Sequence, residues 1–439
     1  MTRSLVLVSA IVALASCGGE VSSPSATAPS ATAPSATAPS ATAPSATAPS
    51  ATAGSPTAGS QAAQASVGFP PLTLLASDAT VAMYDDTDRA VELSGILTAG
   101  NDAVVSATTD VPGSTRVEWH RVPTGELLAA HVVDGNVTVS AVSSDGTLAA
   151  LTDAEPGGTS TMSNIVVVNR NDGVLGQWSL AGNLVPEAFA NAYVAEGNGM
   201  PIGVFAIEYL QPDVYRVRVI DTATGELGLP LNLRNKSQTV DEAMTAISRT
   251  AVFDRHHQLL FTLYQGTVDD MEDQYAFIHT LGLINGVWCL EVPEQLDLGE
   301  HTGALAVTPV GDRLYVASPN GGVASYRVSD VTDINAEPVA ETVAQLGLSG
   351  SRVAIAATGD EVVVAFGSTI ARLDPVTLAV RDTFVWDMSI EAVAVADNGD
   401  VIVAGDARMT RISAAHLLVA ERPLPAGIAD ITGIVAANR

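Results

Sequence analysis

The sequence predicts an all-β fold, because its apolar runs are short, turn residues separate them, and one hairpin recurs. The chain of 439 residues carries 37 glycines and 23 prolines between runs rich in Val and Ala. Short runs bounded by turn residues favour strands over helices. The hairpin is clearest at residues 217–233, VRVIDTATGELGLPLNL, where Asp221 can cap the turn and Gly225 can adopt the positive φ that closes it.

Two hairpin signatures alternate beyond residue 68. The first is a strand, a Gly, Asp or Asn turn and another strand, as in ALAVTPVGDRLYVAS from Ala304. The second resembles residues 217–233 and recurs eight times between residues 81 and 424. One copy of each supplies the four strands of a β-propeller blade. We therefore expect residues 69–439 to form a β-propeller of eight blades, with seven as the alternative because the first, fourth and fifth units are irregular.

The end of the chain supplies a strand that the first blade lacks. Residues 431–436, ITGIVA, match the first strand of the preceding unit and could pair with the strand near residues 72–75. This pairing would close the ring and remove exposed sheet edges, which otherwise invite aggregation. Trp178, Trp288 and Trp386 fall in the outer halves of their repeats, where we expect them to pack.

Residues 1–17 have the pattern of a bacterial lipoprotein signal. Arg3 supplies the positive charge, residues 5–13 the apolar stretch, and residues 14–17, LASC, the lipobox. Cys17 is the predicted lipidation site, because the diacylglycerol is transferred to a thiol; a secretory signal cut elsewhere is the alternative. The apolar run is too short to span a bilayer as a helix. Lipidation of Cys17 would leave Cys289 as a lone thiol, expected to be buried and inert.

Residues 18–68 form a low-complexity linker. SATAP occurs five times from residue 25 to residue 49 and is followed by SATAG and SPTAG. This composition cannot bury a core, and its regular prolines favour an extended polyproline II chain. At about 3.1 Å per residue the linker could reach on the order of 150 Å. Its threonines could also carry sugars.

The charge balance limits the partners of the protein. Twenty basic residues stand against 48 acidic ones, for a net charge of −28. A nucleic acid or an anionic membrane surface would repel such a chain. The sequence therefore favours neutral, cationic or metal-bearing partners, and the alternative is that the acidic surplus serves solubility alone.

The repeats resemble those of a known family. ALAVTPVGDRLYVAS and VRVIDTATGELGL look like the repeats of bacterial YVTN-type, quinoprotein-like β-propellers, and the resemblance covers most of residues 72–436. It implies a ring fold with diverse activities. No catalytic motif of the family is matched, so we carry over no functional residue.

Long connections indicate where a site could lie. Those at residues 153–164, 208–215, 232–244, 265–274 and 293–302 should open on one face of a propeller, and ligand sites favour loops held by a rigid scaffold. The candidate binding residues in them are Glu208, Asp213, Asp241, Glu242, Asp269, Asp270, Asp273, Glu300 and His301.

Metal binding and catalysis have weaker support. Asp269, Asp270, Glu272 and Asp273 form an oxygen-rich cluster that suits Ca²⁺, but their spacing is not that of an EF-hand, and a solvated acidic loop is the alternative. His301 has no nucleophile or second histidine at a recognisable spacing. The sequence thus indicates no catalytic residue and no cofactor beyond a candidate Ca²⁺.

These observations favour a monomeric β-propeller, lipid-anchored on the extracytoplasmic face of a bacterial membrane, that binds a protein or glycan partner. The first alternative is an envelope enzyme of the lyase or quinoprotein-dehydrogenase type, with histidine, arginine and carboxylates converging in the central funnel. The second is a purely structural envelope protein. The sequence does not decide between the inner and the outer membrane.

Overall fold

The structure is a computed structural model, and its described residues all lie in the second of two compact units, Ser66–Arg439. It describes residues 69, 72–76, 80–84, 90–98, 101–190, 203–230, 241, 243–246, 248–267, 274–282, 286–299, 302–333, 339–425, 428 and 430–436. Within these ranges the helical segments are η1 (Glu294–Leu296) and α1 (Val328–Thr332). Neither is long enough to cross a membrane.

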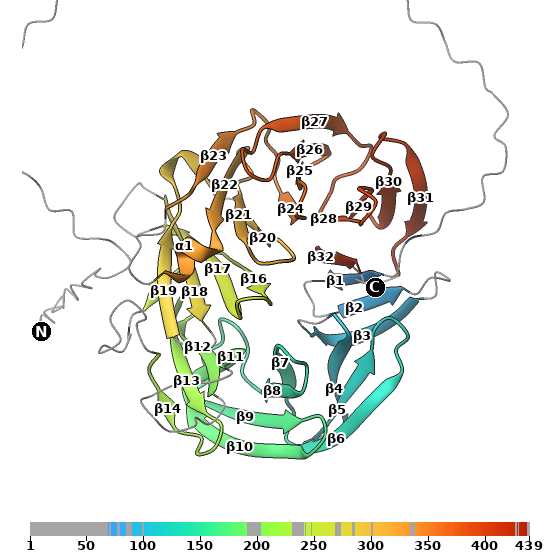
Figure 1. Ribbon diagram of the computed structural model, residues 1–439. Helices are drawn as coiled ribbons and strands as arrows, with labels where there is room; N and C mark the ends of the chain where they lie inside the picture. The colour runs from blue at the N-terminus through green and yellow to red at the C-terminus, as the bar shows by residue number, and fades with distance from the viewer. Residues whose placement is uncertain are drawn as a thin grey trace, which may run out of the picture. The chain divides into compact units, whose positions relative to one another are not determined.

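The described strands of this unit form eight antiparallel sets of four, which we call blades 1 to 8 (Figure 1). Blade 1 contains β32 (Ile431–Ala436), β1 (Leu72–Ala76), β2 (Thr80–Tyr84) and β3 (Ala90–Leu97). Blade 2 contains β3, β4 (Ala103–Val111), β5 (Ser114–Arg121) and β6 (Leu127–Asp134). Blade 3 contains β7 (Thr138–Val142), β8 (Leu148–Thr152), β9 (Met162–Asn169) and β10 (Gly173–Ala181). Blade 4 contains β11 (Asn183–Ala190), β12 (Gly203–Gln211), β13 (Val214–Asp221) and β14 (Leu227–Gly228), with β15 (Met244–Thr245) also paired to β13.

The remaining blades are regular. Blade 5 contains β16 (Ser248–Asp254), β17 (Leu259–Thr267), β18 (Gln274–Gly282) and β19 (Gly286–Glu291). Blade 6 contains β20 (Ala304–Val307), β21 (Arg313–Ala317), β22 (Gly322–Arg327) and β23 (Thr342–Gln345). Blade 7 contains β24 (Val353–Ala357), β25 (Val362–Phe366), β26 (Thr369–Leu373) and β27 (Val380–Val385). Blade 8 contains β28 (Ala392–Val395), β29 (Val401–Gly405), β30 (Arg408–Ile412) and β31 (Leu418–Pro423).

The irregular first unit is explained by β3, which serves two blades. Its first half pairs with β2 up to Ser94, and its second half pairs with β4 from Gly95 onward. A Cβ at Gly95 would lie 2.2 Å from the carbonyl oxygen of Val105, so the change of partner requires a residue without a side chain. Because β3 ends one blade and begins the next, the seven-stranded sheet contains two blades, and the expectation of eight is confirmed.

The strand at the chain's end pairs with the first strand of blade 1, as expected. β32 and β1 are antiparallel, with Leu72 opposite Ala436 and Leu74 opposite Ile434. Leu72, Leu74 and Ile434 are buried in the core between blades 8 and 1. Blade 1 is therefore completed by strands from opposite ends of the described chain.

The connections fall on two faces, because successive strands of a blade run in opposite directions. We call the face that carries the turns between second and third strands, together with the links from blade to blade, the interblade face. The opposite face is the hairpin face. On the interblade face, hydrogen bonds connect these turns to the links between blades. Ala246 N, in the link from blade 4 to blade 5, donates to Asp213 O, in the turn of blade 4, at 3.1 Å. Asn183 Nδ2 donates to the carbonyls of Glu155 and Gly158, each at 2.9 Å.

The turn of the hairpin that starts at residue 217 has the cap and the glycine conformation that the sequence predicts. Asp221 Oδ1 accepts hydrogen bonds from Ala223 N at 2.7 Å and from Thr224 N at 3.0 Å, and Gly225 has a φ of 76°. A Cβ at Gly225 would lie 2.0 Å from the Trp178 ring. Trp178 therefore packs from blade 3 onto the turn of blade 4, and this glycine serves both the turn and the contact between blades.

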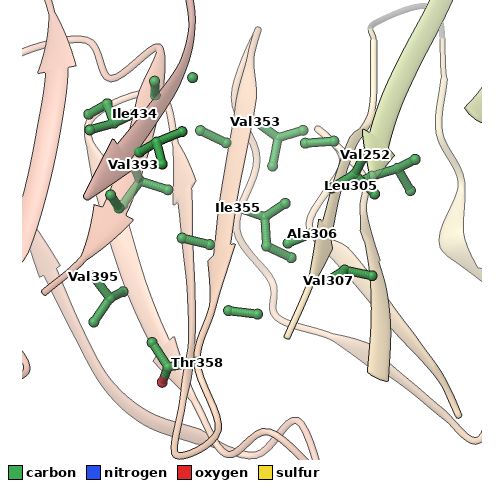
Figure 2. Close-up of a pocket in the computed structure, with 18 of the residues that line it drawn as sticks. Val252, Leu305, Ala306, Val307, Val353, Ile355, Thr358, Val393, Val395 and Ile434 are labelled. Atoms are coloured by element: carbon green, nitrogen blue, oxygen red, sulfur yellow. The ribbon is translucent and has the colours of Figure 1, made fainter. Parts of the chain in front are cut away.

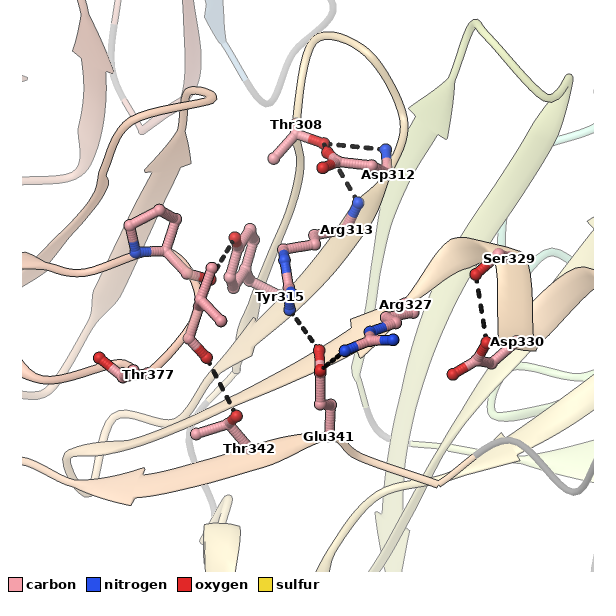
Figure 3. Close-up of polar contacts among 12 residues, drawn as sticks. Thr308, Asp312, Arg313, Tyr315, Arg327, Ser329, Asp330, Glu341, Thr342 and Thr377 are labelled. Carbon is pink, nitrogen blue, oxygen red and sulfur yellow. Dashed lines mark hydrogen bonds and ion pairs between the residues drawn. The ribbon is translucent and has the colours of Figure 1, made fainter.

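Blades 6 and 7 are joined by polar contacts near the hairpin face (Figure 3). Tyr315 donates its hydroxyl to Pro375 O at 2.8 Å, and Thr342 Oγ1 donates to Val376 O at 3.1 Å. Within blade 6, Arg327 and Arg313 donate to Glu341, and these hydrogen bonds hold the pKa of Glu341 below its usual value. Such contacts fix one blade against the next.

Removal of β32 should destabilise the propeller. Deletion of residues 431–439 takes away the partner of β1 and the burial of Ile431 and Ile434, each side chain worth about 1.5–3 kcal/mol. We expect a lower urea midpoint and aggregation through the uncovered edge of β1. Deletion of residues 437–439 alone leaves β32 intact and is the control. An unchanged midpoint for the longer deletion would contradict the closing role of β32.

Candidate functional site

The candidate residues divide between described and undescribed segments. Cys17, Glu242, Asp269, Asp270, Glu272, Asp273, Glu300 and His301 lie outside the described residues, so the Ca²⁺ cluster stays an expectation. Glu208, Asp213 and Asp241 are described, and all three lie in or beside blade 4. Within the ranges that the structure describes, no group of three or more His, Cys, Asp or Glu side chains is arranged to hold a metal ion.

Glu208 lies inside a strand, and the expectation of a long loop at residues 208–215 is wrong. β12 runs to Gln211 and β13 begins at Val214, so the connection is a two-residue turn. The pairing of β12 with β13 continues through Glu208, and Arg216 stands opposite it in the register. A carboxylate can occupy this buried strand position when a guanidinium neutralises it.

A cluster of two arginines and two carboxylates surrounds that position. Arg216 and Arg218 each donate Nε–H to Glu208 Oε2 at 2.7 Å. Both also donate Nη1–H to Asp241 Oδ1, at 3.0 and 2.9 Å. Burial would raise the pKa of Glu208, but the hydrogen bonds from the two arginines outweigh it and hold the pKa below its usual value. The cluster is paired internally and fixes Asp241 against β13.

The connection at residues 153–161 in blade 3 is a long loop, as expected. Asp153 accepts hydrogen bonds from Asn164 N at 2.8 Å and from Asn164 Nδ2 at 2.6 Å. Asn183 holds the middle of the loop through its bonds to Glu155 and Gly158. A Cβ at Gly157 would lie 3.4 Å from Pro212 O, which places this loop against the turn of blade 4.

A second charged pair lies between blades 4 and 5. Arg249 on β16 donates Nη2–H to Glu187 on β11 at 2.6 Å, and the Arg249 side chain is 25% exposed. Burial is the largest single effect on the pKa of Arg249 and lowers it, but Glu187, together with Tyr264 and Tyr209, leaves the pKa above its usual value. Tyr209 and Tyr264 lie close to this pair, and burial raises the pKa of both phenols.

His279 extends this cluster into the core of blade 5. Its ring meets the Tyr264 ring edge to face, with centroids 6.1 Å apart. Burial, together with the nearby positive charge of Arg249, lowers the pKa of His279 to about 4. Cys289 stands opposite His279 in the strand register and is half-buried, less than the full burial that the sequence predicts.

A cavity of about 1260 Å³ lies among the innermost strands of blades 5 to 8 and blade 1. Val353, Ile355, Val393 and Ile434 project around it (Figure 2). Where β24 and β28 begin, the lining includes Arg352 and Glu391, whose side chains pair at 3.4 Å. The wall is mostly short aliphatic side chains, and its charged lining includes Arg352, Asp360, Glu361 and Glu391. Among the described residues no histidine lines it, although the enzyme alternative requires one.

Sequence reasoning missed most of the buried charges. Arg216 and Arg218 are two residues apart on a strand, a spacing that places both side chains on one face and could have indicated a shared acidic partner. Glu187 and Arg249 are 62 positions apart, and no spacing rule connects them. The fold alone brings that pair together.

The chain was compared with known proteins by sequence and by structure. The sequence matches no protein-family model and no curated protein. Among solved structures it is similar to apo AztD from Citrobacter koseri, with 11% identity over 83% of this chain and 97% of that chain and a TM-score of 0.49. It is also similar to BamB from Moraxella catarrhalis, with 13% identity, 77% and 86% coverage and a TM-score of 0.44. Sqt1 from Saccharomyces cerevisiae gives 10% identity, 80% and 87% coverage and a TM-score of 0.45.

Replacement of His279 should make stability less dependent on pH under acidic conditions. Its pKa is lowered from 6.5 to about 4 in the folded chain, so between these values the unfolded chain binds a proton that the folded chain does not. The free energy of unfolding therefore falls as the pH drops through this range, by up to about 3 kcal/mol. We therefore expect the free energy of unfolding of His279→Leu, measured in urea, to decrease less between pH 7 and pH 4 than that of the parent.

The matched control removes a histidine from the surface. His256 lies exposed in the hairpin turn between β16 and β17. We expect His256→Leu to keep the pH dependence of the parent. A pH dependence that is unchanged in His279→Leu would show that His279 does not titrate as its burial requires.

Proposed function

We propose that this protein is a lipid-anchored, extracytoplasmic β-propeller that binds a protein partner through its interblade face. The observation that carries the proposal is the way this face is built. Its loops are fastened to the propeller by hydrogen bonds, such as those from Asn183 to the 153–161 loop and from Ala246 to the turn at Asp213. Loops held in this way present a fixed surface and lose little conformational entropy on binding.

The chemistry of the described groups supports binding over catalysis. The Glu208 cluster is paired within the fold and positions backbone, and Glu187 pairs with Arg249 between blades 4 and 5. The central cavity is walled mostly by aliphatic side chains. The most exposed large hydrophobic side chains of the described residues are Val, Leu and Met, which suit packing against a protein better than stacking on a sugar.

Anchoring and reach follow from the N-terminal residues, which lie outside the described ones. A lipid on Cys17 would hold the chain at a membrane, and the 18–68 linker would let the propeller reach a partner on the order of 150 Å away. The acidic surplus favours a partner that is neutral or basic.

Photocrosslinking should locate the partner on the interblade face. We expect a photoreactive phenylalanine at Thr159, exposed in the 153–161 loop, to capture a discrete protein in living cells. The same residue at Asn398, exposed in the turn between β28 and β29 on the hairpin face, is the matched control. Equal capture from both positions, or capture of polysaccharide alone, would contradict the proposal.

Mass spectrometry of the protein purified from membranes tests the anchor. We expect the N-terminal peptide to begin at Cys17 and to carry diacylglycerol, and Cys17→Ala to move the protein to the soluble fraction. Since a thioether-linked cysteine cannot also form a disulfide, a Cys17–Cys289 disulfide in the unreduced peptide map would overturn the assignment. A Cys289→Ala variant that remains in the membrane fraction is the expected control.

A further inference from the structure

We infer that the interblade face of blades 2, 3 and 4 docks a basic amphipathic segment of the partner protein. This inference rests on the proposed function and names the chemistry of the partner. In each of these blades the connection between the second and third strands exposes an apolar side chain and a carboxylate that forms no ion pair among the described residues. The three pairs are Asp110 with Val111, Glu155 with Met162, and Leu210 with Asp213.

The turn of blade 2 joins β4 to β5. Val111 is 61% exposed at its start, and Asp110 beside it is also exposed. Gly113 N donates to Asn136 Oδ1 at 2.7 Å, and Gly135 N donates to Gly113 O at 2.8 Å. The turn is thus tied to the link that leads into blade 3, and its exposed aliphatic side chain sits on fixed backbone.

The corresponding loop of blade 3 carries the second pair. Met162 is 47% exposed where β9 begins, and Glu155 is exposed in the same loop. The carbonyl of Glu155 accepts a hydrogen bond from Asn183 Nδ2, which fixes the backbone from which the carboxylate projects. A thioether side chain such as that of Met162 adapts to varied apolar partners.

The turn of blade 4 carries the third pair and adjoins the second. Leu210 is 45% exposed near the end of β12, and Asp213 is exposed in the turn just before β13. Ala246 N donates to the carbonyl of Asp213. The close approach of Gly157 to Pro212 shows that the turns of blades 3 and 4 touch, so their apolar side chains belong to one surface.

The chemistry of the three pairs specifies one kind of occupant. Among the described residues, none of Asp110, Glu155 and Asp213 takes part in an ion pair, whereas the carboxylates of the Glu208 cluster are paired. An aliphatic anchor beside an unpaired carboxylate suits a segment that presents apolar and basic side chains together. The apolar contacts supply affinity, and the charges orient the segment and exclude acidic competitors.

A helical Lys/Leu amphipathic peptide is the probe for this surface, with a Glu/Leu peptide of the same pattern as its control. Binding is measured by isothermal titration calorimetry on the full chain with Cys17→Ser, a background that keeps every sample in solution. The apolar variant combines Val111→Ser, Met162→Gln and Leu210→Gln. The charge variant combines Asp110→Asn, Glu155→Gln and Asp213→Asn. We expect each to weaken Lys/Leu binding by about tenfold or more, and the Glu/Leu peptide not to bind.

Matched variants on the hairpin face separate a specific surface from attraction to a net charge of −28. The apolar control combines Val310→Ser, Val376→Ser and Leu417→Gln, at exposed turn positions. The charge control combines Asp172→Asn, Glu226→Gln and Asp397→Asn, also exposed. We expect both controls to bind the Lys/Leu peptide within about threefold of the parent. Circular dichroism melting confirms that each variant is folded.

Two outcomes would overturn the inference. In the first, the charge control weakens binding as much as the interblade charge variant, which would show attraction to the whole chain only. In the second, the interblade variants bind the peptide as the parent does. If capture from Thr159 persists in those variants, the proposed function stands and only the chemistry of the partner is wrong. Loss of capture in the parent itself would contradict the proposed function instead.

Discussion

The pairing of β32 with β1 is the constraint on which the rest of the propeller depends. A blade of four strands has two edges, and an open edge leaves a row of unpaired backbone groups that attracts other chains. Here the first blade is built from both ends of the described chain, with Leu74 opposite Ile434 in the register. The neighbouring blades then pack on a completed sheet, and the buried residues of β1, β29 and β32 share one core cluster.

Two kinds of interaction then make the ring of blades rigid. Apolar clusters fill the spaces between neighbouring sheets, as where Tyr315 and Val323 of blade 6 meet Val362 and Phe366 of blade 7. Polar contacts cross the same boundaries at their ends, as between Tyr315 and Pro375. Close-packed protein interiors have low compressibility, so turns on one face keep their spacing. A surface assembled from several blades depends on that fixed spacing.

The repeat pattern made the fold predictable, and chain topology made the site largely unpredictable. Strand and turn signals are local, so the blades, the cap at Asp221 and the pairing of β32 followed from residue order. The sharing of β3 between two blades depends on the close approach of Gly95 to Val105, which only the folded sheet reveals. The sequence predicts a long connection at residues 208–215, whereas β12 continues through Glu208 to Gln211. The partner of Glu208, Arg216, lies across a turn whose length the sequence did not specify.

The distribution of arginines explains why the interblade turns of blades 2 to 4 remain acidic. Buried arginines neutralise buried carboxylates within their own blades: Arg218 binds Glu208, Arg372 binds Glu361 and Arg411 binds Asp400. Burial of an unpaired carboxylate would cost several kcal/mol, so these three arginines are needed as partners of the buried carboxylates. The sequence has 20 basic residues against 48 acidic ones, and Asp110, Glu155 and Asp213, which no arginine pairs among the described residues, lie exposed to water. An aliphatic side chain exposed among such carboxylates can then be covered favourably only by a partner that brings its own positive charge.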